Sequence, residues 1–255
     1  MVLLLHLIYF FCMHTWYSLL LFVITCLGGS IPLWIKGLDD RRMHYLLAFS
    51  GSFLLSITFL HLLPETFEDL NASAGFYLLI GFFFQLVIQR FTHGVEHGHT
   101  HIHPHEHGHV IALAPILTGL SLHAFMEGLP LGFNYRMHGT EPSLYMAVAI
   151  HKIPEAMLVT SLVAAVKGKS RGLLTLILFS AVTPVAGLLA QLLGEHYNFM
   201  SKTIMILIPV VAGAFIHIAT TIFFESGTKQ HLLTRQKIMA MLFGVGLAML
   251  TLYFD

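Results

Sequence analysis

The stretches LTGLSLHAFMEGLPLGF (residues 117–133) and MAVAIHKIPEAMLVTSL (residues 146–162) each place a histidine four residues before a glutamate in otherwise apolar sequence. The pairs are His123 with Glu127 and His151 with Glu155. Residues four apart lie on the same face of a helix, so each pair directs an imidazole nitrogen and a carboxylate oxygen the same way. Two such helices facing each other predict a cage of four metal ligands.

The chain around these pairs has the composition of a membrane protein. Of its 255 residues, 56% are apolar and only 10% are charged, whereas a soluble domain carries about 25% charged residues. Spans of about 20 apolar residues are predicted at 17–35, 44–63, 74–89, 111–133, 143–166, 172–193, 203–224 and 237–253. We therefore expect an all-α membrane protein of eight transmembrane helices, forming a single domain over residues 1–255.

Ionisable residues near the middle of such spans need an explanation. Each costs about 2.5–3.5 kcal/mol at the bilayer centre on insertion scales, and a bound divalent cation would offset that cost. The alternative is that neutral imidazoles and protonated carboxyl groups pack at a helix interface. One buried histidine is ordinary, but a repeated His-x-x-x-Glu at matched depth favours a metal site.

Basic residues in the loops predict the orientation. One set of alternate loops contains Lys36, Arg41, Arg42, Arg90, Lys167, Lys169, Arg171, Lys229, Arg235 and Lys237, and the other set contains only Arg136 and Lys202. The basic set belongs on the cytoplasmic side, which places both termini on the non-cytoplasmic side. We expect a multi-pass protein of the plasma membrane or of a bacterial inner membrane.

A histidine-rich loop at about residues 91–110 joins the third and fourth predicted spans. After His93, histidines recur at nearly alternate positions: His97, His99, His101, His103, His105, His107 and His109. Such a tract cannot form a packed core and is typical of flexible, metal-binding polypeptide. We expect weak, exchangeable binding of Zn, Ni or Cu in the cytosol.

Two further histidines are candidate ligands along a path through the membrane. His61 and Glu65 repeat the four-residue spacing at the outer end of the second span and predict an entrance site. His217 lies in the cytoplasmic half of the seventh span and is a candidate exit ligand. A packing role for His217 is an equally good interpretation.

Prolines and glycines lie beside the central motifs. Pro130 and Pro154 each remove a backbone donor, and distorted helices near the midplane often line transporter sites. Gly128 and Gly132 form a pair of small residues four apart, which predicts that another helix approaches closely.

The motifs together resemble the ZIP (Zrt/Irt-like) family of divalent metal transporters. HLLPE in the second span, HAFMEG in the fourth, HKIPEA in the fifth, the histidine-rich third loop and the eight spans fit in order across nearly the whole chain. The resemblance implies a three-plus-two-plus-three arrangement with inverted repeats, transport toward the cytoplasm, and a homodimer. It also implies that His123, Glu127, His151 and Glu155 form the primary transport site.

The chain departs from the family pattern where some members bind a second metal. Those members have polar or acidic ligands where this chain has Ala124, Lys152 and Thr183. A lysine ammonium would repel a second cation at short range, so we expect one transported metal rather than two. Alternatively, Lys152 reaches the membrane surface or pairs with an unrelated carboxylate.

The function expected is transport of divalent transition metals. Two imidazoles and two carboxylates suit Zn(II) and tolerate Fe(II), Mn(II), Cd(II) or Co(II). The metal is cargo, so we expect no resident cofactor, and we expect metal ions and the lipid bilayer, not nucleic acid, as partners. The alternatives are an intramembrane zinc-dependent hydrolase, for which no general base is evident, and a metal sensor that binds through the loop without moving ions.

Overall fold

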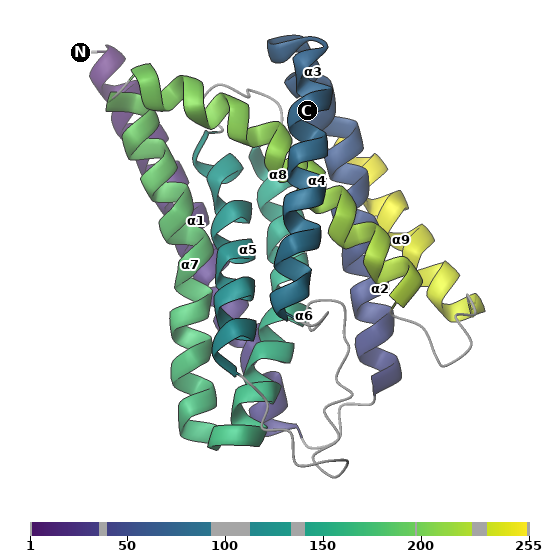
Figure 1. Ribbon diagram of the computed structural model, residues 1–255. Coiled ribbons are helices and arrows are strands. Elements are labelled where there is room, and N and C mark those ends of the chain that lie inside the picture. Colours follow the sequence, from purple (N-terminus) through teal and green to yellow (C-terminus); the bar gives the residue numbers. More distant parts are fainter. Residues whose placement is uncertain are drawn as a thin grey trace.

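The chain is almost entirely helical in the computed structural model, which describes residues 2–35, 40–92, 113–133, 141–196, 198–225 and 234–253 (Figure 1). The elements are α1 (Val2–Trp34), α2 (Asp40–Ile57), a π-helical turn η1 (Thr58–Leu62), α3 (Leu63–Leu70), α4 (Ser73–Thr92), α5 (Leu113–Phe133), α6 (Glu141–Lys167), α7 (Lys169–His196), α8 (Asn198–Glu225) and α9 (Arg235–Thr251). Because α2, η1 and α3 follow one another without a break, these residues form eight continuous helices. The expected all-α architecture is confirmed.

Six of these helices are long and apolar enough to cross a membrane by length and composition. They cover Thr15–Trp34, Arg42–Leu70, Ser73–Thr92, Ser143–Lys167, Lys169–Gly194 and Met205–Phe223, in agreement with six predicted spans. The other two predicted spans, 111–133 and 237–253, coincide with α5 and α9. α5 is 21 residues long and contains His123 and Glu127, and α9 is 17 residues long.

The outside of the bundle is apolar, as expected for a surface in contact with lipid. Large side chains on three helices are mostly exposed: Phe76 of α4 at 64%, Leu178 of α7 at 63% and Phe243 of α9 at 66%. Polar side chains instead lie inside, among them His123 and Glu127 of α5 and His151 and Glu155 of α6. This distribution of apolar and polar side chains is the reverse of that in a soluble domain and fits a multi-pass integral membrane protein.

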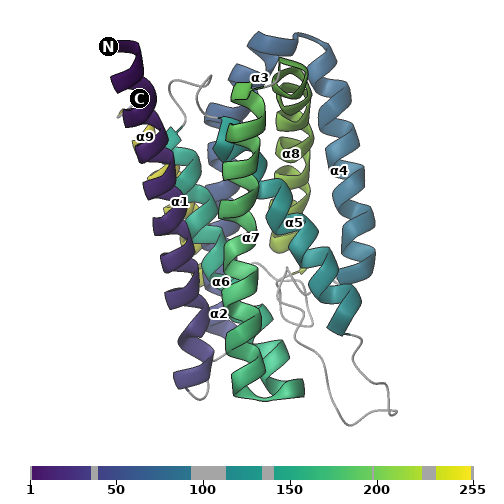
Figure 2. The same ribbon diagram turned by 90° about the vertical axis from the view of Figure 1, so that its left-hand side faces the viewer.

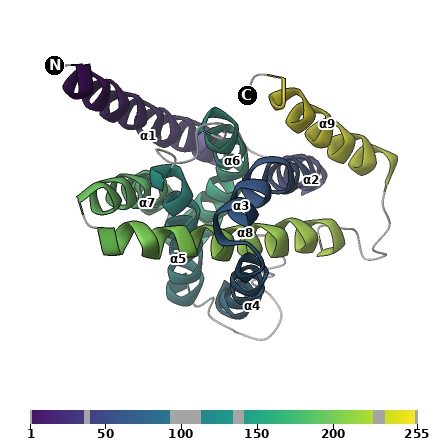
Figure 3. The same cartoon turned by 90° about the horizontal axis from the view of Figure 1, so that it is seen from above.

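The helices pack as two groups. In the first, here called the α5–α6 group, α5 packs on α7, and α1 packs on both α6 and α7. In the second, called the α4–α8 group, α4 packs on α8, α2 packs on α9 and α8, and η1 with α3 extends α2. Figure 2 shows α1 and α4 at opposite sides of the bundle, and in the view from above α7 and α9 lie at opposite edges (Figure 3).

Glycines allow the closest helix contacts within each group. A Cβ atom at Gly128 would overlap the carbonyl oxygen of Thr183, and one at Gly132 would overlap that of Gly187, so α5 and α7 touch through their backbones. The predicted close approach at Gly128 and Gly132 is therefore confirmed. Gly81 allows the same close contact between α4 and α8, because a Cβ atom there would overlap the carbonyl oxygen of Val210.

This packing predicts the effect of adding a single methyl group. Gly132→Ala would place a Cβ atom against the backbone of α7, so the two helices must separate, at a cost of about 1–3 kcal/mol. We expect a lower melting temperature in detergent, measured by tryptophan fluorescence or by thermal aggregation. The matched control is Gly246→Ala in α9, where a Cβ atom meets no heavy atom within 4 Å. Equal melting temperatures for the two variants would contradict the backbone contact.

Candidate metal centre

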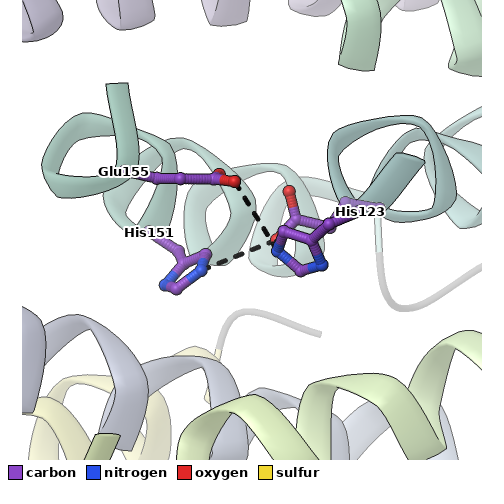
Figure 4. Close-up of side chains that lie close together, drawn as sticks. His123, His151 and Glu155 are labelled. Atoms are coloured by element: carbon purple, nitrogen blue, oxygen red, sulfur yellow. Dashed lines mark ion pairs between the residues drawn. The ribbon is translucent and has the colours of Figure 1, made fainter. Parts of the chain in front are cut away.

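The four residues of the two central motifs converge between α5 and α6. His123 and Glu127 lie one turn apart on α5, and His151 and Glu155 lie one turn apart on α6. Each residue offers one ligand atom, and the four atoms all lie within 4.8 Å of one another. In Figure 4, His151 and Glu155 extend from one helix toward His123 on the facing helix. These four residues are called the cage below.

The distances within the cage suit a small cation. Oε1 of Glu127 lies 3.0 Å from Nε2 of His123 and 3.7 Å from Nε2 of His151, and Oε1 of Glu155 lies 3.9 Å from Nε2 of His123. Tetrahedral zinc ligands at about 2.0–2.1 Å from the metal are about 3.4 Å from one another. Small side-chain adjustments would therefore bring all four atoms around one ion.

The cage is fully enclosed and its polar atoms lack ordinary partners. His151 is 0% exposed and the other three residues are each 1% exposed. Among the described residues, Nδ1 of His123, both nitrogens of His151 and Oε1 of Glu155 make no hydrogen bond, and Nε2 of His123 faces Oε1 of Glu127. Buried polar atoms almost always have hydrogen-bond partners, so a cluster of exceptions needs another ligand. The cage is thus able to hold a metal ion.

Lys152 contributes a positive charge directly beside the cage. Its Nζ atom contacts Oε2 of both Glu127 and Glu155 and lies 5.1 Å from the centre of the Phe179 ring. The side chain is buried, so it does not extend to the membrane surface. Its partners are the carboxylates of the cage itself, which rules out the alternative of an unrelated carboxylate.

The other two positions that depart from the family pattern are used in packing. Thr183 of α7 donates its hydroxyl to the carbonyl oxygen of Ala124 in α5, over 2.9 Å. Ala124 is fully buried. This hydrogen bond joins the two helices whose backbones touch at Gly128, and Ala124 has no side chain that could bind a metal.

The prolines leave the helices of the cage intact. α5 continues as an α-helix through Pro130, and α6 continues through Pro154. The irregular turn lies instead in the second span, where η1 precedes Pro64. Proline cannot donate to the carbonyl four residues earlier, and π-helical turns often occur at functional sites.

The predicted entrance pair lies on this irregular turn, outside the cage. His61 is buried in η1 and its Nε2 atom lies 2.9 Å from Oγ1 of Thr251 in α9. Glu65 follows one turn later in α3 and is half-buried. Both residues belong to the α4–α8 group, so the structure does not bring them together with the four cage residues. Their entrance role remains a prediction.

His217 lies in a second buried polar cluster, between α8 and α4. Its Nε2 atom lies 2.8 Å from Oε1 of Gln89, and its ring packs edge-on against Phe82. One turn before Gln89, Gln85 is fully buried, and its amide makes no hydrogen bond with any described residue. Sequence reasoning missed both glutamines, although two amides four apart in the apolar run FFFQLVIQR were a usable signal.

The histidine-rich loop cannot be compared with its prediction. His97, His99, His101, His103, His105, His107 and His109 all lie outside the described residues. Metal binding by this loop stays a prediction.

An apolar pocket elsewhere in the bundle is separate from the cage. In the described part of the chain, a cavity of about 380 Å³ opens between α1 and α6 and is lined by residues such as Tyr17, Ile24, Tyr145 and Ile150. None of the four cage residues lines it.

The fold and the site together define a polytopic helical membrane protein with a buried His/Glu cluster able to hold a metal. The family model of the ZIP zinc transporters matches residues 14–114 and 96–252, which is most of the chain. The chain belongs to the ZIP zinc transporter family, whose members are transporters and not enzymes. No curated protein matches the chain.

Proposed function

We propose that this protein carries divalent transition-metal ions, with Zn(II) as its main cargo, into the cytoplasm through the cage of His123, Glu127, His151 and Glu155. The observation that supports this most directly is the convergence of two imidazoles and two carboxylates within 4.8 Å, fully buried in a membrane-spanning bundle. Nitrogen and oxygen ligands without thiolate suit Zn(II) and also accept Fe(II), Mn(II), Cd(II) or Co(II).

The two helix groups support a carrier mechanism. All four cage residues belong to the α5–α6 group, which contacts α2, α4 and α8 of the other group. A shift of the α5–α6 group against the α4–α8 group would move the cage as a unit from one side of the membrane toward the other, as in many secondary transporters. Protein groups replace the water that the ion sheds on entering the cage.

The pattern of helix contacts supports the proposed three-plus-two-plus-three arrangement with inverted repeats. Exchanging α1 with α7, α2 with α8, α4 with α9 and α5 with α6 converts the α5–α7 contact into α6–α1. The same exchange converts α4–α8 into α9–α2, and α2–α6 into α8–α5. It also exchanges the two ligand pairs of the cage, as expected for a site on the pseudo-symmetry axis of a single domain.

Transport toward the cytoplasm is what the family resemblance implies, and the proposed path rests on polar groups outside the cage. The basic loops place both termini on the non-cytoplasmic side, so His61 and Glu65 lie toward the entrance. On the cytoplasmic side of the cage, the proposed path continues to the polar side chains of His217 and Gln89, which contact each other one turn from the buried amide of Gln85. The homodimer and the plasma or bacterial inner membrane stay predictions from the sequence.

The first test is uptake of radioactive zinc into proteoliposomes. His151→Ala removes a ligand from the cage, and we expect at least a tenfold slower uptake at low zinc, because a lost ligand contributes well over 1.4 kcal/mol. The matched control is His44→Ala on α2, which removes a half-buried histidine outside the cage and is expected to leave uptake within about twofold. Unchanged uptake by the His151 variant would refute the proposal.

The second test concerns the number of metal ions. Because Lys152 contacts both carboxylates, we infer that its ammonium takes the place of a second ion and repels it. We expect one zinc per cage in the wild type and two in Lys152→Ala, measured on purified protein by isothermal titration and by elemental analysis. A stoichiometry of one in both proteins would show that Lys152 does not exclude a second ion.

The third test separates a carrier from a sensor. Deletion of residues 93–109 removes the histidine-rich loop and leaves the cage intact. We expect the deleted protein to keep zinc uptake in proteoliposomes, since the cage does not depend on the loop for its ligands. Loss of uptake, with zinc binding at the cage retained, would assign a necessary role to the loop.

A further inference from the structure

We propose that Lys152 is the built-in counter-cation of the carrier: its ammonium stays beside the cage with and without cargo and limits the net charge of the moving site to one unit in both states. This inference rests on the proposed transport function. It goes beyond the exclusion of a second ion, because it concerns the net charge of the site while it moves and not the number of ions that the site binds.

The lysine and the cargo would contact different oxygens of the two carboxylates. Nζ of Lys152 contacts the Oε2 atoms of Glu127 and Glu155. The Oε1 atoms of the same two residues face Nε2 of His123, at 3.0 Å and 3.9 Å. A metal ion bound by the Oε1 atoms and the imidazoles therefore does not need the oxygens that hold the ammonium, so both cations bind at once.

The surroundings of Lys152 keep it in place. Its side chain is 2% exposed, and its ammonium lies 5.1 Å from the centre of the Phe179 ring, an arrangement that stabilises a cation. Lys152 and Glu155 lie three residues apart on α6, while Glu127 reaches them from α5. The ammonium thus bridges the two helices of the cage and moves with them.

A count of formal charges shows what the lysine changes. With neutral imidazoles, the two carboxylates and the ammonium give a net charge of −1 without cargo and +1 with a divalent ion. Without the lysine these values would be −2 and 0. The free energy of placing an ion in a low-dielectric medium grows with the square of its charge. An empty site without the lysine would then cost about four times as much free energy to move through the bundle as an empty site with Lys152.

A carrier must move its site in both directions, loaded on the way in and empty on the way back. Lys152 gives these two states charges of equal size, so neither movement carries a doubly charged site through the bundle. The same ammonium repels the cargo at short range and lowers its affinity. We therefore expect Lys152 to weaken zinc binding and to accelerate the return of the empty carrier.

The experiment compares net uptake with exchange. Lys152→Met keeps the length and bulk of the side chain and removes its charge. Purified full-length protein in proteoliposomes is assayed for net uptake of radioactive zinc, which requires the empty site to return, and for exchange of radioactive against unlabelled zinc, in which the site moves loaded both ways. We expect the ratio of net uptake to exchange to fall at least about tenfold and KM for zinc to fall with it.

Three further proteins make the result decisive. Lys152→Arg keeps the charge and should restore the ratio to within about threefold of wild type. Lys167→Gln removes an exposed charge from the same helix and should leave the ratio unchanged. If Lys152→Met does not purify as a folded chain that binds zinc, Lys152→Gln replaces it with the same expected ratio.

Other outcomes separate this proposal from the function on which it rests. An unchanged ratio in the uncharged variant, or an equal fall in net uptake and exchange, would overturn the counter-cation role. If His151→Ala also retains both uptake and exchange, the cage is not the transport site and the proposed function fails. If His151→Ala loses both while the Lys152→Met ratio stays normal, only the counter-cation role is refuted.

Discussion

The structure depends on the neutralisation of two carboxylates inside a membrane-spanning bundle. Glu127 and Glu155 are each 1% exposed, in the interior of the bundle, where an unpaired charge is costly. Lys152 contacts both of them, and His123 lies 3.0 Å from Glu127. The contact of Lys152 with Glu127 crosses from α6 to α5, so one interaction sets both the electrostatics of the site and the packing of its two helices.

The packing of α5 follows from the same constraint. One face of the helix presents His123 and Glu127 to α6, and another places Gly128 and Gly132 against the backbone of α7. The hydroxyl of Thr183 binds the carbonyl of Ala124 on that second face. α5 is thereby fixed on two sides by contacts that leave little room for displacement, which holds its ligands at a fixed position relative to α6. A metal site gains affinity and selectivity from such preorganised ligands.

Much of this site could be predicted from the sequence, and the limits of that prediction have physical causes. The four-residue spacing sets which side chains share a helix face, so the cage followed from His123, Glu127, His151 and Glu155 alone. The contact of Lys152 with Glu155 follows from their three-residue spacing on α6. Its contact with Glu127 depended on how α5 and α6 meet, which no spacing within one helix determines. The π-helical turn at η1 was missed because proline predicts a disturbed carbonyl but not the form of the disturbance. The amides of Gln85 and Gln89 were missed because glutamine carries no charge to mark it in an apolar span.

The placement of polar contacts explains how such a bundle could move without losing its structure. The contacts of Lys152 join α6 to α5 and α7, and Thr183 joins α7 to α5, all within the α5–α6 group. His61 joins η1 to α9, and His217 joins α8 to α4, both within the other group. Directional contacts therefore hold each group together.

Between the groups, Leu47 of α2 and Ile218 and Ile222 of α8 belong to one buried apolar cluster with Leu120 of α5 and Val159 of α6. Apolar contact is non-directional, so it tolerates sliding, whereas a hydrogen bond or ion pair must break. Of the contacts just named, the directional ones lie within the groups and the apolar cluster lies between them, an arrangement that would favour motion between the groups. All four residues of the cage belong to the α5–α6 group.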